Sequence, residues 1–285
     1  MRAVLRSLHV YPVKSLRGIT RESATLTDLG LEHDRAWLLV DGQGQFMSQR
    51  RYPAMATIDT RLESDCLVLS AEGQSSLAVP FLPGDGRRFK TRVWDDDCDV
   101  LDEGDDAARW FASALRLDTP PRLVRMAPGF RRTLKRPERY GDGTTTFFAD
   151  TAPLLVANTA SLAALNEALE GRGQAPVPMD RFRANLVIEG PGAFEEHRHT
   201  SLEGEACRIG LRYPRERCVM TTLDQATGAR DPSGEPFRTL RDINPMPDNP
   251  RGPAFGELGV VEAGSGAVLR CGDRFELTGE RGPGA

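Results

Sequence analysis

One cysteine in the sequence, Cys218, has neighbours that could make its thiol reactive. Arg215 and Arg217 precede it, and positive charge near a thiol favours the ionised thiolate form. A thiolate can act as a nucleophile or as a ligand for a soft metal. Taken alone, the segment favours a packing role, because cysteine is among the most commonly buried residues. The residues that follow, 219–223, predict a short β-strand.

Two other segments carry cationic and amide side chains that could bind a phosphate or another oxyanion. Lys14 and Ser15 lie in a predicted turn, which by itself is more typical of a solvated loop. Arg181, Arg183 and Asn185 alternate just before a predicted buried strand. They would face the same side if that strand begins early, and guanidinium groups suit phosphate well.

Acidic and histidine side chains at three further places could take part in acid–base chemistry or metal binding. His33 and Asp34 are neighbours, and neighbouring side chains on a strand point to opposite faces, so we expect Asp34 to orient an arginine. Asp224 opens a predicted turn, which is usually a structural role, but it is a candidate for proton handling. His197 and His199 lack a third ligand at a familiar spacing, which favours a solvated loop.

Composition narrows the classes of partner. The chain has 285 residues, of which 39% are hydrophobic and 27% charged, and its net charge is −4. This balance does not indicate nucleic acid or an anionic membrane as a partner. No apolar run approaches the roughly 20 residues of a membrane span, and the first apolar run is too short for a signal peptide.

The cysteines are scattered and odd in number. None of the five forms a CxxC pair, which argues against a zinc ribbon or an iron–sulfur cluster. Free thiols at irregular spacing are typical of a reducing compartment, so we expect a cytoplasmic protein. The cysteines are Cys66, Cys98, Cys207, Cys218 and Cys271.

Short alternating runs separated by glycine and proline predict a chain that is mainly β with a few helices. Six or seven short strands in the first part indicate a β-barrel or a rolled sheet. Helices are predicted at 105–115, 161–169 and 237–243. The eight acidic residues between 95 and 106 predict a solvated loop, and the basic stretch at 130–140 predicts a mobile loop or boundary.

Several motifs, in the expected order, resemble the MOSC family, named after the C-terminal domain of molybdenum cofactor sulfurase. Residues 11–19 and 31–40 are similar to the N-terminal β-barrel module that precedes MOSC domains, and residues 179–188 and 217–228 are similar to the MOSC domain itself. The resemblance covers nearly the whole chain. It implies an α+β fold in which a barrel-like module, residues 1–118, packs on a MOSC β-barrel domain, residues 119–285.

Within this family the sequence is most similar to the group of amidoxime-reducing components and their bacterial relatives. That resemblance implies that the Cys218 thiolate ligates molybdenum held by a pterin dithiolene, the molybdenum cofactor. Two positions depart from the group's pattern, because Ala152 replaces a common serine and Glu216 replaces a small residue. The residues implied to hold the pterin and its phosphate are Lys14, Ser15, Arg35, Asp150, Thr151, Arg183, Asn185 and Arg217.

The implied activity is reduction of small N-hydroxylated compounds such as amidoximes, with Asp224 as the candidate proton-handling group. Because the cysteines of a ferredoxin module are absent from this sequence, a separate ferredoxin- or cytochrome-type donor and its reductase are expected. Two alternatives stay open: a sulfur carrier or transferase with a Cys218 persulfide, and a non-catalytic cofactor-binding protein. For the wider family the resemblance also implies pyridoxal phosphate binding.

Overall fold

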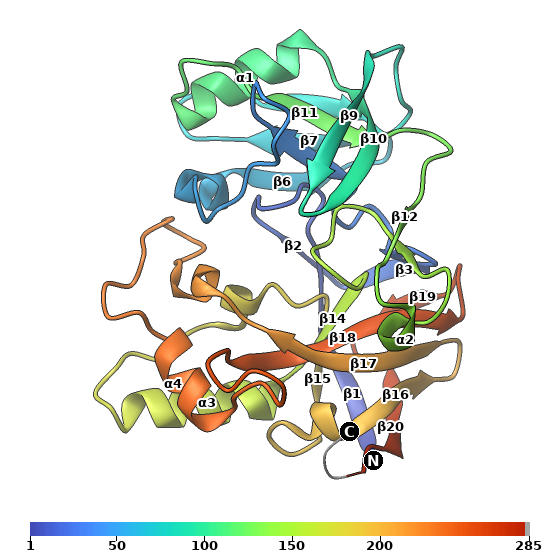
Figure 1. Cartoon of the computed structure of the whole chain (residues 1–285), viewed down its shortest axis with the longest axis vertical. Coiled ribbons are helices and arrows are strands. Elements are labelled where there is room, and N and C mark those ends of the chain that lie inside the picture. Colours follow the sequence, from blue (N-terminus) through green and yellow to red (C-terminus); the bar gives the residue numbers. More distant parts are fainter. Residues whose placement is uncertain (283–285) are drawn as a thin grey trace.

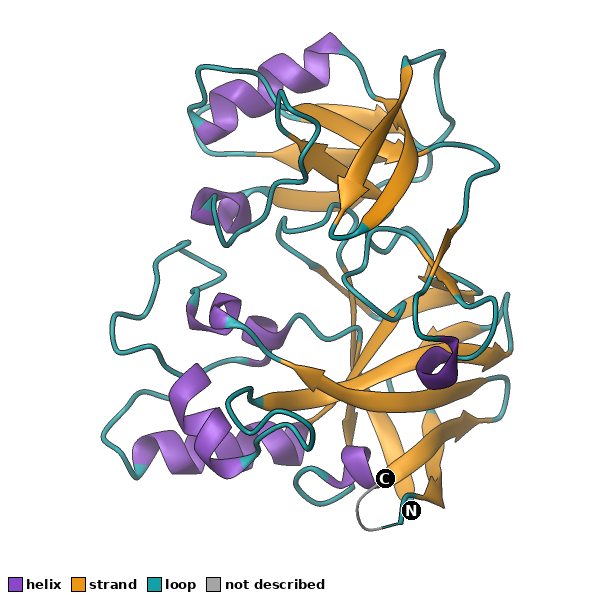
Figure 2. Ribbon diagram, in the orientation of Figure 1, coloured by secondary structure: helices purple, strands orange, loops and turns teal. Residues whose placement is uncertain are grey.

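Strands form most of the fold that the computed structural model describes for residues 1–282. They gather into two bodies along the longest axis of the molecule (Figure 1). We call the strands between residues 37 and 126 the upper body, and those at 2–31 and 154–280 the lower body. The few helices lie at the periphery of the sheets (Figure 2). The predicted fold class, mainly β with a few helices, is confirmed.

The lower body contains a closed barrel. Seven strands form a ring, and all neighbours in it are antiparallel except β14 and β15. Alternate residues of β1, Ala3 and Leu5 and then Leu8 and Val10, are buried in its core, as the two-residue period of a strand requires, and a bulge after Leu5 shifts the register between the two pairs. In ring order the strands are β1 (Arg2–Val10), β15 (Leu186–Glu189), β14 (Leu154–Asn158), β18 (Ala254–Ala263), β17 (Arg208–Glu216), β16 (His199–Gly204) and β20 (Arg274–Glu280).

The first strand closes this ring, although most of the other ring strands come from the second half of the chain. β1 pairs with β15 on one side and with β20 on the other. Short strands continue the lower body around it, namely β2 (Ile19–Arg21), β3 (Ser23–Thr27), β4 (Gly30–Leu31) and β19 (Val268–Arg270). The division predicted between residues 118 and 119 stays a prediction. The two bodies do not follow it along the chain, because the strands at 2–31 precede it but belong to the lower body, and the strand at 122–126 follows it but belongs to the upper body.

The upper body has two small sheets around an apolar core. That core includes Trp37, Met55 and Phe111. One sheet runs β5 (Trp37–Val40), β11 (Arg122–Met126), β10 (Asp96–Asp102) and β9 (Arg88–Val93), and the other runs β6 (Asp59–Leu62), β7 (Cys66–Ser70) and β8 (Leu77–Pro80). The connection to the lower body contains β12 (Arg132–Thr133), α2 (Pro137–Tyr140) and β13 (Thr145–Thr146).

Three helices form where the sequence predicts them. α1 (Asp105–Leu115) buries its apolar face against β11 and β8. Its first-turn aspartates lie at the positive end of the helix dipole, where negative charge stabilises the helix. α3 (Thr159–Glu170) begins at Asn158, whose side chain accepts a hydrogen bond from the Ala160 amide, as expected of an N-cap. α4 (Phe237–Ile243) packs beside α3. The 3-10 helices are η1 (Pro53–Thr57), η2 (Met179–Phe182), η3 (Glu195–Arg198) and η4 (Val219–Thr222).

The strand predicted after Cys218 is wrong, and the buried strand predicted after Asn185 forms but does not begin early. Residues 219–222 form η4 because the hydroxyls of Thr221 and Thr222 donate to the carbonyls three residues earlier, at 3.0 and 2.7 Å. Such local bonds compete with strand pairing. Residues 179–182 form η2, Arg183 is left-handed with φ 53°, and the strand begins only at Leu186. The even spacing of 181, 183 and 185 therefore does not come from a strand.

Two predicted loops are also wrong. Most of the acidic stretch forms β10, because Cys98 and Val100 are buried in the core of the upper body and fix the strand. The basic stretch contains an ordered segment, in which buried Arg132 donates to Asp96 at 2.9 Å. Pairing with acids of the upper body therefore orders residues that look like a solvated loop in the sequence.

The predicted solvated loop around His197 and His199 is wrong as well. His197 lies on η3 and contacts the carboxylate of fully buried Glu257 at 2.8 Å. His199 begins β16 and is buried. Both histidines thus belong to the base of the barrel.

Candidate functional site

A cavity lies where the two bodies meet, and it collects most of the candidate residues. The turn after β1, the β9–β10 hairpin, the segment before β14, the η2–β15 segment and the end of β17 all contribute to its lining. Asp224 is not part of that lining. Nine of the ten residues predicted from the sequence are: Lys14, Ser15, Arg35, Asp150, Thr151, Arg183, Asn185, Arg217 and Cys218.

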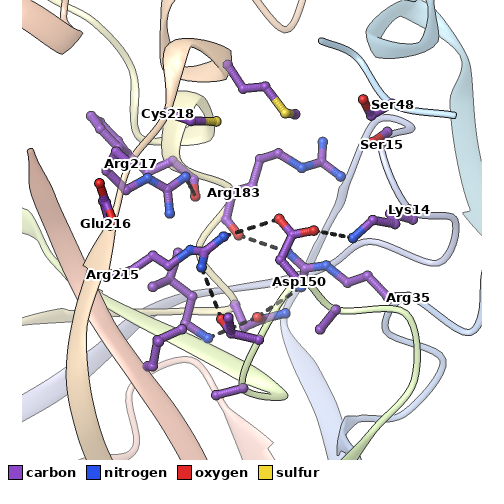
Figure 3. A pocket seen from close by; sticks show the side chains of 18 of the residues that line it. Lys14, Ser15, Arg35, Ser48, Asp150, Arg183, Arg215, Glu216, Arg217 and Cys218 are labelled. Atoms are coloured by element: carbon purple, nitrogen blue, oxygen red, sulfur yellow. Dashed lines mark hydrogen bonds and ion pairs between the residues drawn. The ribbon is translucent and has the colours of Figure 1, made fainter. Parts of the chain in front are cut away.

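Cys218 is half-buried and lines the cavity. Figure 3 shows its sulfur directed toward the middle of the space that Arg183 and Asp150 also face. The residue immediately precedes η4, and its carbonyl accepts a hydrogen bond from the Thr221 amide at 3.1 Å. The 3-10 turn therefore fixes the backbone of Cys218 and leaves its thiol free to face a ligand.

The cavity carries a large excess of positive charge. Opposite the seven cations stand only two acids, Asp150 and Glu216. Such an excess inside a concave site favours an anionic ligand. The cations are Lys14, Arg35, Arg50, Arg181, Arg183, Arg215 and Arg217.

Three of these arginines have buried nitrogens without a hydrogen-bond partner among residues 1–282. They are Arg181 Nε, Arg183 Nη2 and Arg217 Nε. Burial lowers the pKa of Arg183 to about 10, and burial together with neighbouring Arg215 lowers that of Arg217. Buried donors are normally satisfied, so this side of the cavity has the properties expected of an anion site without its anion.

Asp150, in contrast, is fully engaged with the protein. It accepts hydrogen bonds from Lys14 Nζ, from Arg215 Nη2 at 3.2 Å and from Trp94 Nε1 at 3.1 Å. Burial alone would raise the pKa of Asp150, but the charges of Lys14 and Arg215 hold it well below its usual range. Figure 3 shows the contacts of Lys14 and Arg215 reaching the carboxylate from opposite sides. Asp150 therefore connects three segments of the chain.

Arg35 is also held in place by the protein. Its guanidinium donates to Asp34 at 2.5 Å, to the Asn185 side chain at 3.0 Å and to the Arg183 carbonyl at 3.2 Å. The expectation that Asp34 orients an arginine is confirmed. Arg35 and Arg183 each lie 4.3 Å from the Tyr11 ring centroid, so the aromatic ring spaces two like charges.

Unusual backbone conformations concentrate at this cavity. Ser15, Arg35, Trp94 and Arg183 all have left-handed φ values, between 48° and 68°, without being glycine. Such conformations cost energy and cluster at functional sites, where the surrounding structure enforces them. Here they direct side chains from separate segments into one space.

Asp224 lies outside the cavity. Its Oδ1 accepts from the amides of Ala226 and Thr227 at 3.0 and 2.9 Å, and its Oδ2 accepts from Arg181 at 3.1 Å. Hydrogen bonds from Thr227 are the largest cause that lowers its pKa. In this position Asp224 closes a turn and orients Arg181, and the structure does not bring it to the proposed chemistry.

The two departures from the family pattern have structural explanations. Ala152 is buried in a small apolar cluster with Leu258 and Val260. Glu216 lines the cavity, but its carboxylate accepts from the Asn249 side chain at 2.8 Å. Glu216 is therefore held toward the 249–252 loop.

Sequence reasoning predicted the turn at Lys14 and Ser15 but missed the other residues that the upper body contributes to the cavity. Phe46, Ser48, Arg50 and Trp94 all line the cavity. In addition, the buried amides of Gln49 and Gln225 bond each other at 3.0 and 3.2 Å across the two bodies. The Asp41–Gly42 turn predicts the local hairpin but gives no information on which side of it meets the lower body.

The fold and the site together define a two-part β protein with a positively charged cavity that contains one cysteine. Known protein families match two segments of the chain: the MOSC N-terminal beta barrel domain matches residues 2–118, and the MOSC domain matches residues 143–276. The chain belongs to the MOSC family.

Named relatives agree with this assignment. Mitochondrial amidoxime reducing component 2 of Bos taurus is 32% identical, over 82% of this chain and 70% of that protein. Mitochondrial amidoxime-reducing component 1 of Homo sapiens is 30% identical, over 96% and 82%. Molybdenum cofactor sulfurase of Drosophila willistoni is 30% identical, over 81% of this chain but only 28% of that protein.

Proposed function

We propose that this protein is a molybdenum-cofactor-dependent reductase of small N-hydroxylated compounds, with Cys218 as a ligand of the metal. The observation that carries the proposal is that Cys218 shares one cavity with buried, unpartnered guanidinium donors. The names of the relatives supply the reaction class, because several are amidoxime-reducing components.

The residues fit a phosphate-bearing pterin. A phosphate accepts several charge-assisted bonds and suits arginine, and the free nitrogens of Arg181, Arg183 and Arg217 are such donors. Among residues 1–282, no group of three or more His, Cys, Asp or Glu could hold a metal. A metal at Cys218 therefore needs further ligands from a cofactor, and a dithiolene sulfur pair matches the soft cysteine thiolate.

The predicted pterin-holding residues would act in two ways. Arg183 and Arg217 have free donors and would contact the phosphate directly, with Ser15 beside them in the lining. Asp150 and Asn185 already bond the protein, so they would position the cations around them. Lys14, Arg35 and Thr151 would complete the cradle, with Thr151 accepting from Arg215 at 3.1 Å.

The reaction converts an N–OH group into N–H and water, and it consumes two electrons and two protons. The bound cofactor supplies the two-electron chemistry. The chain's own residues would bind the anionic cofactor and hold Cys218 at the start of η4. Asp150 would keep the cations around it in place. We propose that the electrons come from a separate ferredoxin- or cytochrome-type donor with its reductase, and that the protein acts in the cytoplasm. No helix within residues 1–282 combines the length and apolarity that crossing a bilayer demands.

Elemental analysis of protein from a cofactor-competent host tests the proposal. We expect about one molybdenum per chain in the wild type, together with amidoxime reduction driven by a chemically reduced viologen. Cys218→Ser should lose at least about 100-fold in activity. Cys66→Ser, which alters a half-buried thiol outside the cavity lining, should behave like wild type. Wild-type protein that takes up no molybdenum would contradict the proposal.

A second candidate function is sulfur transfer through a persulfide on Cys218. The similarity to a molybdenum cofactor sulfurase favours it, and a reactive thiolate serves both roles. Intact mass spectrometry separates them, because a persulfide adds the mass of one sulfur atom to Cys218 in protein without metal. A non-catalytic cofactor-binding protein would instead hold molybdenum and reduce no N-hydroxylated compound.

A further inference from the structure

We propose that Trp94 is the aromatic wall against which the substrate lies, and that it selects N-hydroxylated compounds whose N–OH-bearing group, such as an amidoxime, is attached to a flat ring. This inference rests on the proposed function and names the substrate class of the same site. It assigns a specificity role to a residue that no motif of the sequence singles out.

Trp94 stands at the junction of two cavities. It belongs to the tip of the β9–β10 hairpin, through which the upper body reaches the site. A second cavity adjoins the first on the side of α2, and its lining includes Tyr140, Tyr213 and Met246. Among the described residues that line both cavities, Trp94 is the only aromatic one. A substrate that reaches from one space into the other must therefore pass its indole ring.

The backbone at this position would suit a smaller residue. Val93 pairs with Asp96, so Trp94 and Asp95 form a two-residue hairpin turn. Such turns need a left-handed residue and favour glycine or asparagine there. Trp94 instead adopts φ 56° with a bulky side chain. A strained turn that carries tryptophan indicates that the indole itself has a use.

The indole is both fixed and accessible. Its Nε1 donates to Asp150 at 3.1 Å, and Phe46 packs edge-on at 5.0 Å between ring centroids. The Arg50 guanidinium lies 5.6 Å from the ring centroid. Even so, 44% of Trp94 is exposed, so part of the ring is open to a ligand.

A fixed, open indole face recognises planar π systems. Offset stacking of aromatic rings adds binding energy beyond burial alone, and it does not depend on the charge of the ligand. An aromatic amidoxime such as benzamidoxime presents a ring next to the N–OH group, whereas acetamidoxime presents only a methyl group. The wall should therefore favour the aromatic compound.

The competing explanation is that Trp94 only connects the two bodies through its bond to Asp150. Two variants separate the explanations. Trp94→Phe keeps an aromatic face and loses the Nε1 donor, whereas Trp94→Gly loses both and suits the left-handed backbone. Trp110→Phe is the matched control, because Trp110 lies on α1 and its Nε1 donates to the Ser75 carbonyl, outside both cavities.

The experiment measures KM and kcat for benzamidoxime and acetamidoxime, together with molybdenum content. We expect Trp94→Gly to lower the preference for benzamidoxime about tenfold through KM, which corresponds to about 1.4 kcal/mol. Trp94→Phe should keep most of the preference, and all variants should keep their molybdenum. Separately, benzamidoxime should quench the tryptophan fluorescence of the oxidised wild type and of Trp110→Phe, but much less that of Trp94→Phe.

Either of two results would overturn the assignment: equal losses for both substrates in Trp94→Phe and Trp94→Gly, or quenching that Trp94→Phe retains in full. Protein without molybdenum and without turnover would instead overturn the proposed function. In that case the fluorescence titration still decides whether Trp94 contacts flat N-hydroxylated compounds.

Discussion

Two walls of the cavity differ in how their charges are satisfied. Around Asp150, Lys14 and Arg215 both contact a carboxylate of the protein. Around Arg183 and Arg217, buried donors have no partner among residues 1–282. The first wall is electrostatically complete, and its Asp150 also bonds Trp94 of the upper body, whereas the second wall is incomplete and is suited to a ligand. A cluster of arginines in a sequence does not reveal this distinction.

The largest expected effect on stability comes from removing the acid of the complete wall. Asp150→Asn leaves Lys14 and Arg215 without their counter-charge, and we expect a loss of about 2 kcal/mol in the free energy of unfolding. The expected loss is smaller than for a fully buried pair because the Asp150 side chain is 38% exposed. Denaturant titration measures it.

The control for this variant is Asp106→Asn, which disrupts an exposed pair with Arg109 on α1. Exposed pairs contribute little, so its free energy of unfolding should stay within about 0.5 kcal/mol of wild type. Equal effects in both variants would mean that Asp150 does not join the bodies.

Removing a cation from the incomplete wall should have the opposite sign. Arg183→Met removes a buried, incompletely bonded charge, so the ligand-free protein should gain about 1 kcal/mol of stability. Inorganic phosphate should raise the melting temperature of the wild type, because binding to the folded state stabilises it. It should raise that of the variant much less. Exposed Arg21→Met should respond like wild type. A variant that is less stable without phosphate would argue that the wall is complete.

The smallest effect concerns a buried charge cluster outside the cavity lining, formed by His197, Glu196 and Glu257. Burial opposes the charged form of His197, but Glu257 and Glu196 raise its pKa above 6.5, the ordinary histidine value. This contribution to stability is therefore fully present below pH 6.5 and is lost as the pH rises through the folded-state value.

Unfolding of wild type and His197→Gln between pH 5 and 9 checks this direction, and the difference between the two should shrink as the pH rises. Taking the difference separates His197 from His9 and His33, whose pKa values are lowered by burial. A constant difference across this range would mean that His197 does not titrate there.

Local patterns predicted much of this structure. The helix at 105–115 was predictable because its apolar spacing and its acidic first turn agree, and the turn at Lys14 and Ser15 was predictable from its flanking proline and glycine. The nine cavity residues came together in the prediction only through the family resemblance. No local rule relates Lys14 to Asp150 across more than a hundred positions.

The failures also have physical causes. The strand predicted after Cys218 failed because threonine hydroxyls bond the preceding carbonyls, which composition does not reveal. Trp94 was missed because its role depends on the meeting of two bodies. The acidic stretch was misjudged because charged residues can lie among buried ones on a strand such as β10.

The closure of the barrel by β1 has a consequence for biosynthesis. The partners of residues 2–10 include residues 186–189 and 274–280, so β1 leaves the ribosome long before the strands that pair with it. The strands of the upper body all lie within residues 37–126 and can assemble early. Nascent chains should thus carry a folded upper body together with an unpaired β1 until residues 186–280 have been translated, a state in which chaperones would have the most to protect.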